Sequence, residues 1–246
     1  MAQMNWTPLH KAARSADVAT LRRLIDAGAS LDAVSSTSRT PLFYLCMFTN
    51  VPIWRLAVSM DDRVACTKLL IEAGANLEAT DNLGRTPLHE VAKDGCPELL
   101  SLLIQSGANV NVADADGQTP LIYASSGGCT SCVDALLAAG ASVNARSSVH
   151  PNSYAGQPPL AVALGRNHRR VWPSLLRAGA EIPHQNYNGE FFWLHPYILR
   201  VQDAGGFKKY EQAHLSRITA ILAPTPLLPP ELVRKVLEFW LHAGYY

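Results

Sequence analysis

The strongest constraint on this chain is an internal repeat. Within residues 1–183 a Thr-Pro-Leu or Pro-Pro-Leu tripeptide occurs five times, and its copies begin at Thr7, Thr40, Thr86, Thr119 and Pro158. Two of the spacings are 33 residues, and the other two are longer by 13 and by 6 residues. A fixed period of this length predicts a stack of similar units, each too small to bury a core alone.

Each unit predicts two helices followed by a projecting arm. In the third copy, Thr86 at the N-cap and Pro87 at the first helical position start a helix, because proline has no N–H to leave unsatisfied there. Apolar residues at helical spacing, such as Leu99 and Leu103, predict a second helix, and Gly107 can end it in the left-handed conformation. Residues 109–117 alternate and end in turn residues, which predicts a hairpin.

These units resemble the ankyrin repeat. The pattern D-x-x-G-x-T-P-L-H-x-A-A, a second helix, then L-L-x-x-G-A-x-V-N, is matched nearly in full from Asp81 to Asn111 and well from Asp114 to Asn144. The resemblance implies an all-α ankyrin solenoid of five repeats over residues 1–183. It also implies a concave face, made of first helices and hairpin tips, that binds other proteins.

Two insertions interrupt the period. The first, at about 49–61 in the second repeat, has an apolar centre that includes Ile53 and Trp54. We expect residues 51–58 to be ordered and partly helical, with Trp54 buried. The second insertion, at about 147–156, predicts a longer hairpin.

The segment 184–246 is rich in aromatic residues and predicts helices near 190–203, 206–222 and 230–241. Because a stack must cover the apolar side of its last unit, we interpret the segment as a helical cap. It resembles the tails of some algal and protist ankyrin proteins. The expected inward residues are Phe207, Tyr210, Leu232, Val236 and Phe239, and the expected outward residues are Arg234, Lys235 and Glu238.

A second interpretation of the tail stays open. The run from Leu228 to Leu237 resembles the opening of an F-box, which would make the chain a substrate-recognition adaptor of a ubiquitin ligase. Too few residues follow Leu228 for the other helices of an F-box, which favours the cap. An enzyme with a site formed by the tail is a more distant alternative.

Composition excludes several classes of partner. A net charge of +1 gives no field for a polyanion, so neither nucleic acid nor a membrane is expected. Neither a signal peptide nor an apolar run of membrane-spanning length is found, which favours a cytoplasmic or nuclear, monomeric protein. The five cysteines are an odd number in a long chain, and we expect them to be reduced thiols.

No catalytic motif stands out, so we expect no enzyme activity, no cofactor and no metal site. His10 and His89 are expected to tie their turns together by hydrogen bonds. Cys129 and Cys132 form a CxxC motif, but no second ligand pair completes a zinc site. We expect core packing there.

Candidate partner-binding residues are those at concave-face positions where stacking dictates no particular side chain. They are Trp6, Arg14, Arg39, Met47, Phe48, Leu83, Arg85, Lys93, Asp94, Asp116, Gln118, Tyr154 and Arg166. Their types are common in interface hot spots, although Trp6, Met47 and Phe48 could instead cover the first repeat and the root of the insertion. We hypothesise that Arg39, Arg85 and Lys93, with Leu83, bind an acidic segment, in a field that Asp94 and Asp116 weaken.

Overall fold

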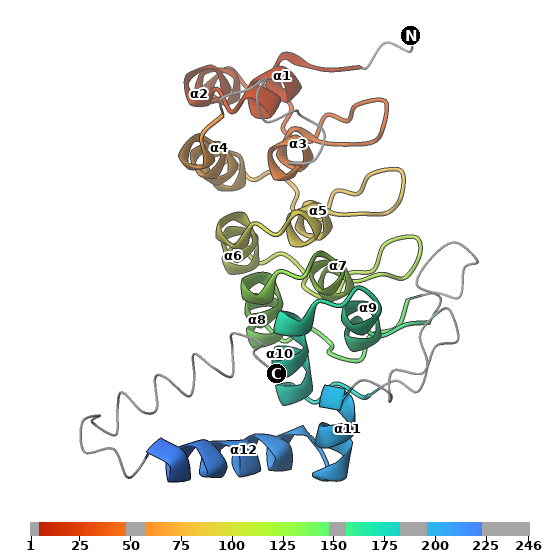
Figure 1. Cartoon of the computed structure of the whole chain (residues 1–246). Helices are drawn as coiled ribbons and strands as arrows, with labels where there is room; N and C mark the ends of the chain where they lie inside the picture. The colour runs from red at the N-terminus through yellow and green to blue at the C-terminus, as the bar shows by residue number, and fades with distance from the viewer. Residues whose placement is uncertain (1–4, 48–57, 148–155, 183–195, 223–246) are drawn as a thin grey trace.

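The computed structural model describes residues 5–47, 58–147, 156–182 and 196–222, and the side chains of the last helix as far as residue 217. Helices and turns make up these ranges, and no β-strand occurs in them. Figure 1 shows two columns of helices with loops projecting from one side. The predicted all-α ankyrin solenoid is confirmed.

The five inner helices lie nearest the projecting loops. They are α1 (Pro8–Ser15), α3 (Pro41–Cys46), α5 (Pro87–Asp94), α7 (Pro120–Gly127) and α9 (Pro159–Gly165). The outer helices are α2 (Val18–Asp26), α4 (Met60–Glu72), α6 (Pro97–Gln105), α8 (Thr130–Ala138) and α10 (Trp172–Arg177), the last preceded by the 3-10 turn η1 (Arg169–Val171). Every inner helix starts with the proline of the repeated tripeptide, as the sequence predicts.

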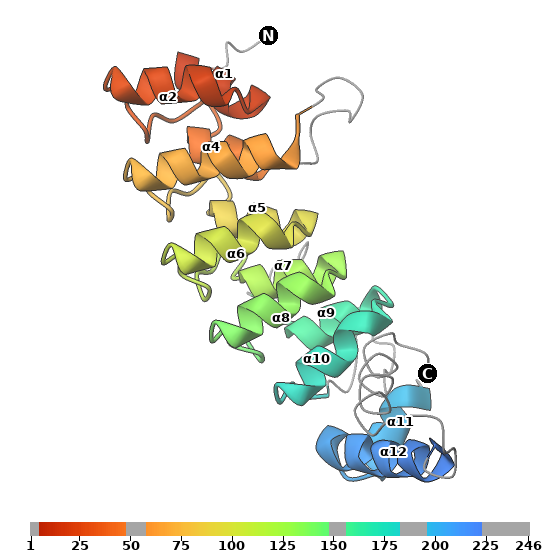
Figure 2. The same ribbon diagram turned by 90° about the vertical axis from the view of Figure 1, so that its left-hand side faces the viewer.

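Successive repeats stack inner helix on inner helix and outer helix on outer helix. Figures 1 and 2 show this stacking from two sides, with each pair offset from the one before. One continuous apolar core runs through all the pairs, and leucines such as Leu42, Leu88, Leu121 and Leu160 are almost fully buried in it. Each repeat therefore depends on its neighbours for burial.

Between an outer helix and the next inner helix the chain forms a projecting loop, which we call a finger. The fingers comprise residues 29–39, 75–85, 108–118 and 141–157, of which 148–155 lie outside the described residues. Tight turns rather than paired strands shape the described fingers. In the finger of repeat three, the Asp81 N–H donates to the Arg85 carbonyl and the Gly84 N–H donates to the Asp81 carbonyl.

Hydrogen bonds also join successive fingers. The Asn82 N–H lies 3.4 Å from the Thr37 carbonyl, and the Ala115 N–H lies 3.0 Å from the Leu83 carbonyl. Gly84 has a φ of +73°, and a Cβ there would lie 2.8 Å from the Ala115 nitrogen. Glycine is thus required both by the backbone conformation and by the close approach of the next finger.

A second set of bonds joins the bases of the fingers. The Glu78 carboxylate accepts the Asn109 N–H, the Asn111 side chain accepts the Ser142 N–H, and the Asn144 side chain accepts the Glu181 N–H. The pattern repeats because the same sequence position holds a polar acceptor in each repeat.

The described part of the tail packs against the last repeat. Helix α11 (Pro196–Asp203) buries Tyr197 and Val201, and helix α12 (Phe207–Leu222) buries Phe207 and Tyr210 as predicted. Tyr197 lies between Trp172 of α10 and Tyr210, with ring centroids 6.0 and 5.7 Å away.

An ion pair of 2.6 Å joins Arg177 of α10 to Glu211 of α12.

Several predicted features lie outside the described residues. They are the helix near 230–241, the F-box-like run, the outward residues Arg234, Lys235 and Glu238, and the part of the insertion over 51–57 that includes Trp54. Val58, the last residue of that prediction, packs against the core. None of the described helices has the length and apolar character needed to cross a bilayer.

Candidate functional site

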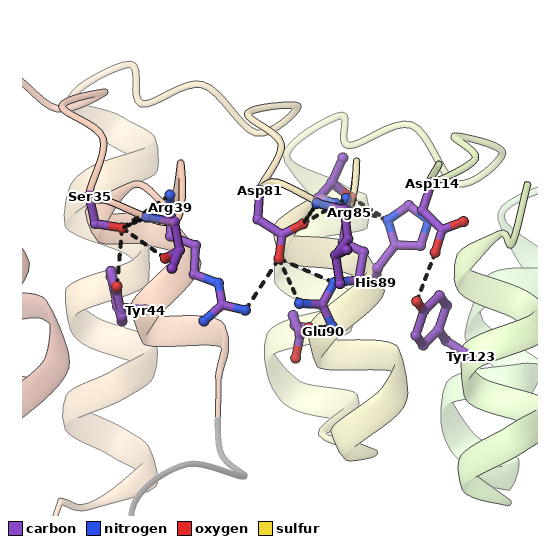
Figure 3. Close-up of polar contacts among 12 residues, drawn as sticks. Ser35, Arg39, Tyr44, Asp81, Arg85, His89, Glu90, Asp114 and Tyr123 are labelled. Atoms are coloured by element: carbon purple, nitrogen blue, oxygen red, sulfur yellow. Dashed lines mark hydrogen bonds and ion pairs between the residues drawn. The ribbon is translucent and has the colours of Figure 1, made fainter. Parts of the chain in front are cut away.

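The concave side of repeats two and three is organised around Asp81. Its Oδ1 accepts the backbone N–H groups of Leu83 and Arg85, which closes the finger turn. Its Oδ2 accepts hydrogen bonds from the Arg85 guanidinium, at 2.6 Å, and from Arg39 of the preceding finger, at 3.3 Å (Figure 3). Although burial alone would raise the pKa of Asp81, these hydrogen bonds lower it below its usual value.

Arg85 also pairs with the carboxylate of Glu90 on α5. Burial raises the pKa of Glu90, and the Arg85 charge opposes that rise. The pKa of Arg85 is raised, because the bond to Asp81 and the charge of Glu90 outweigh the effect of burial. The guanidinium is therefore held between two carboxylates.

The position of Glu90, four residues after the capping threonine, holds tyrosine in the flanking repeats. The Tyr123 hydroxyl donates to Asp114 at 2.8 Å, and the Tyr44 hydroxyl donates to Ser35 at 3.2 Å (Figure 3). Ser35 and Asp114 occupy the finger position of Asp81. In three successive repeats the side chain at this helix position is thus connected to the finger of its own repeat. The connection is direct in repeats two and four, and it runs through Arg85 in repeat three.

Three candidate residues are buried. For Arg85 and Gln118 the prediction of a solvent-facing side chain is wrong, whereas burial of Met47 agrees with the alternative that it covers the root of the insertion. Arg85 is 8% exposed because its charge is paired with Asp81 and Glu90. Gln118 is 9% exposed, since it is the last finger residue before α7 and its N–H is bonded to Asp114.

Met47, the residue after the end of α3, is 7% exposed. Its carbonyl and that of Leu45 accept hydrogen bonds from Arg63 of α4, at 3.2 and 2.9 Å. These bonds hold the root of the insertion against the stack.

The other described candidates remain accessible. Leu83, at the turn of its finger, is 57% exposed. Lys93 and Arg166, at the ends of α5 and α9, are exposed, whereas Trp6, Arg14, Arg39, Asp94 and Asp116 are half-buried. Phe48 and Tyr154 lie outside the described residues.

Trp6 stands at the start of the concave side and is held from two directions. Its ring meets Tyr44 edge-on with centroids 5.0 Å apart, and the Arg14 guanidinium lies 4.8 Å from the ring centroid. The structure thus combines the two interpretations of Trp6, because the ring covers repeat one and still keeps a solvent-facing part.

The two histidines of the repeated motif have structural roles, as predicted. The Nδ1 of His89 accepts the Thr86 N–H at 3.0 Å, and its Nε2 lies 3.0 Å from the Gln118 carbonyl of the next finger. His10 bonds in the same way to Thr7 and to the Arg39 carbonyl. Burial lowers the pKa of both imidazoles, so both are neutral at pH 7.

The cysteines are free thiols, and Cys132 is fully buried in the core as predicted. Across the described ranges, no three side chains of His, Cys, Asp or Glu gather in a way that could hold a metal ion.

Glu90, Tyr44 and Tyr123 were not among the sequence candidates. The signal that could have found them is one polar or aromatic residue at the same place in three repeats, since a helix position facing its own finger selects a hydrogen-bonding side chain.

Comparison with protein families supports the same architecture. A family model described as ankyrin repeats in three copies matches residues 54–147, and one described as ankyrin repeats in many copies matches residues 9–58. The search of curated proteins gives no match. The family matches span more than half of the chain, and the α9 and α10 pair continues the stack beyond them. The chain therefore belongs to the ankyrin repeat family.

Proposed function

We propose that this chain is a protein-binding module whose partner lies across the concave face, on the finger of repeat three and the ends of the inner helices. Ankyrin repeats generally mediate protein–protein interaction. The observation that carries the proposal is Leu83, an apolar side chain 57% exposed at a finger turn. Its own N–H is bonded to Asp81 and its carbonyl to Ala115, so its backbone is fixed before a partner binds.

The cations at the ends of the inner helices favour an acidic partner segment that also carries an apolar side chain for Leu83. Lys93 is exposed at the end of α5, and Arg14 and Arg166 lie at the equivalent ends of α1 and α9. Arg39 and Arg85 contribute little field, because Asp81 and Glu90 neutralise them. This revises the patch expected from the sequence: Lys93 replaces Arg85 as its central cation.

We place the protein in the cytoplasm or nucleus, as a monomer that acts by binding and not by catalysis. The ligase-adaptor alternative needs the F-box-like run after Leu228, which lies outside the described residues.

The test is site-specific photocrosslinking in cell extract. A photoreactive amino acid at position 83 should crosslink a protein that the same group at Gln105, an exposed residue of α6, does not capture. Charge reversal by Lys93→Glu should slow association of that protein, most strongly at low salt. Arg22→Glu on the exposed surface of α2 is the matched control and should leave the rate unchanged.

Two results would show that the partner does not bind at this part of the concave face. One is equal crosslinking from positions 83 and 105, and the other is an association rate at low salt that Lys93→Glu leaves unchanged. Capture of ubiquitin-ligase subunits that depends on residues 205–246 would favour the ligase adaptor.

A further inference from the structure

The CxxC motif sits at the start of outer helix α8. Cys129 is the N-cap residue, and its Sγ accepts the N–H of Cys132 at 3.3 Å. In α2 and α4 the same position holds Asp17 and Ser59, whose oxygens accept the equivalent N–H. Sulfur has therefore replaced oxygen as the helix cap in this one repeat.

The two sulfurs are close and differ in accessibility. The Cys129 and Cys132 Sγ atoms lie 2.7 Å apart. Cys129 is half-buried, whereas Cys132 is completely buried in the core. The Cys129 sulfur also lies 3.8 Å from the carbonyl oxygen of Gly95 in the preceding turn. Cys129 is thus the more accessible residue of the pair, and the sulfur of the buried Cys132 lies directly beside its own.

The surroundings favour a negative charge on Cys129. The hydrogen bond with Cys132 and the N–H groups of Cys132 and Ser131 lower the pKa of Cys129 to about 6. The same bond and burial raise the pKa of Cys132. Cys129 is thus the more acidic thiol of the pair and Cys132 the less acidic one, although burial of Cys129 opposes the lowering of its pKa. CxxC pairs at helix N-termini show the same division in general.

Repeat three provides an internal comparison. Cys96 is the N-cap residue of α6, but the third residue of that helix is Leu99, not cysteine. The Cys96 sulfur makes no capping bond and lies 3.7 Å from the Met60 sulfur and 3.4 Å from a carboxylate oxygen of Glu98. Burial and the Glu98 carboxylate raise the pKa of Cys96, so this buried thiol differs from Cys129 in its surroundings as well as in having no second cysteine three residues later.

We propose that Cys129 and Cys132 form a redox-active dithiol that exchanges with disulfides of the glutathione class. The Cys129 thiolate attacks one sulfur of oxidised glutathione, forms a mixed disulfide and expels one glutathione thiolate. Cys132 gives its proton to that thiolate and attacks the Cys129 sulfur, which releases the second glutathione as a thiolate that takes a proton from water. The dithiol loses two electrons, and one glutathione disulfide becomes two thiols.

The test uses the reduced full chain, oxidised glutathione at pH 7, acid quenching and peptide mass mapping. The wild type should form an internal disulfide between Cys129 and Cys132. Cys132→Ala should stop at a mixed disulfide between Cys129 and glutathione, whereas Cys129→Ala should carry no adduct at Cys132. Cys96→Ala is the matched control and should behave as the wild type.

A second readout needs no variant. Iodoacetamide should alkylate Cys129 at least about ten times faster than Cys96 at pH 7, because the reagent reacts with the exposed thiolate. Alkylation of Cys129 no faster than Cys96, or a stable glutathione adduct on wild-type Cys129 with no ring closure, would overturn the proposal.

Discussion

The Asp81 carboxylate accepts a hydrogen bond from Arg39, a residue of the preceding finger, with 3.3 Å between Oδ2 and Nη2. The same oxygen accepts from Arg85, so one buried carboxylate serves its own repeat and the interface with the repeat before it. Repeats two and three are thus joined by charge as well as by apolar packing.

Replacing Asp81 by Asn should lower the free energy of unfolding by about 3 kcal/mol, because the substitution keeps the shape but leaves two partly buried guanidinium groups without their shared carboxylate. Urea denaturation followed by circular dichroism measures the loss. Asp114→Asn is the matched control and should cost less, since its Oδ2 accepts only a tyrosine hydroxyl. Equal losses would mean that the inter-repeat ion pair contributes nothing of its own.

Stability should decrease on mild acidification. The folded-state pKa values of His10 and His89 lie below the unfolded value of 6.5, so the unfolded chain binds protons first as the pH falls. The free energy of unfolding therefore declines as the pH drops through 6.5, until the folded-state pKa values are reached. The urea midpoint at pH 5.5 should lie below that at pH 7.5. His89→Gln should reduce the difference, and a difference that His89→Gln leaves unchanged would assign it to other groups.

Gly84→Ala should destabilise the protein more than Gly107→Ala. Both glycines have positive φ, which costs alanine about 1 kcal/mol. Only at position 84 would the new methyl also meet the Ala115 nitrogen, whereas no atom lies within 4 Å at position 107. We expect an additional loss of about 1–3 kcal/mol. The melting temperatures of the two variants, measured by thermal denaturation, test this expectation. Identical melting temperatures would show that the next finger can move away from the added methyl group.

Deleting residues 205–246 should lower the melting temperature and cause self-association. The deletion removes Phe207 and Tyr210, which cover Tyr197 and the α10 side of repeat five. Size-exclusion chromatography with light scattering detects the association. Tyr210→Ala should weaken the full chain, whereas Lys208→Ala, an exposed residue on the same helix, should not. A truncated protein that stays monomeric and melts as the full chain does would favour the adaptor interpretation of the tail.

Much of the fold could be predicted because the signals are local. A threonine at the N-cap followed by proline favours the start of a helix, and α1, α3, α5 and α7 begin as the tripeptides at 7, 40, 86 and 119 indicate. Pro158 keeps the proline at the first helical position of α9 without a capping hydroxyl.

The site could be predicted only in part, because exposure depends on pairs of residues in different elements. The repeat position of Arg85 predicts a solvent-facing side chain, but the actual burial follows from Asp81 in the finger and Glu90 in the helix. Met47 is also buried, and its backbone carbonyl is bonded to Arg63, which lies beyond the insertion. The side chains of Leu83 and Lys93 are exposed, as their positions in the repeat predict.

The bonds between finger turns also have a mechanical consequence. The Asn82-to-Thr37 and Ala115-to-Leu83 hydrogen bonds each cross one boundary between repeats, so a pull on the two ends of the stack puts the same force on both boundaries, as on links in series. The longer Asn82 bond, at 3.4 Å, belongs to the boundary that Arg39 and Asp81 reinforce with charge. Under tension the ankyrin stack would extend boundary by boundary, and the ion pair acts as a clamp at the second boundary.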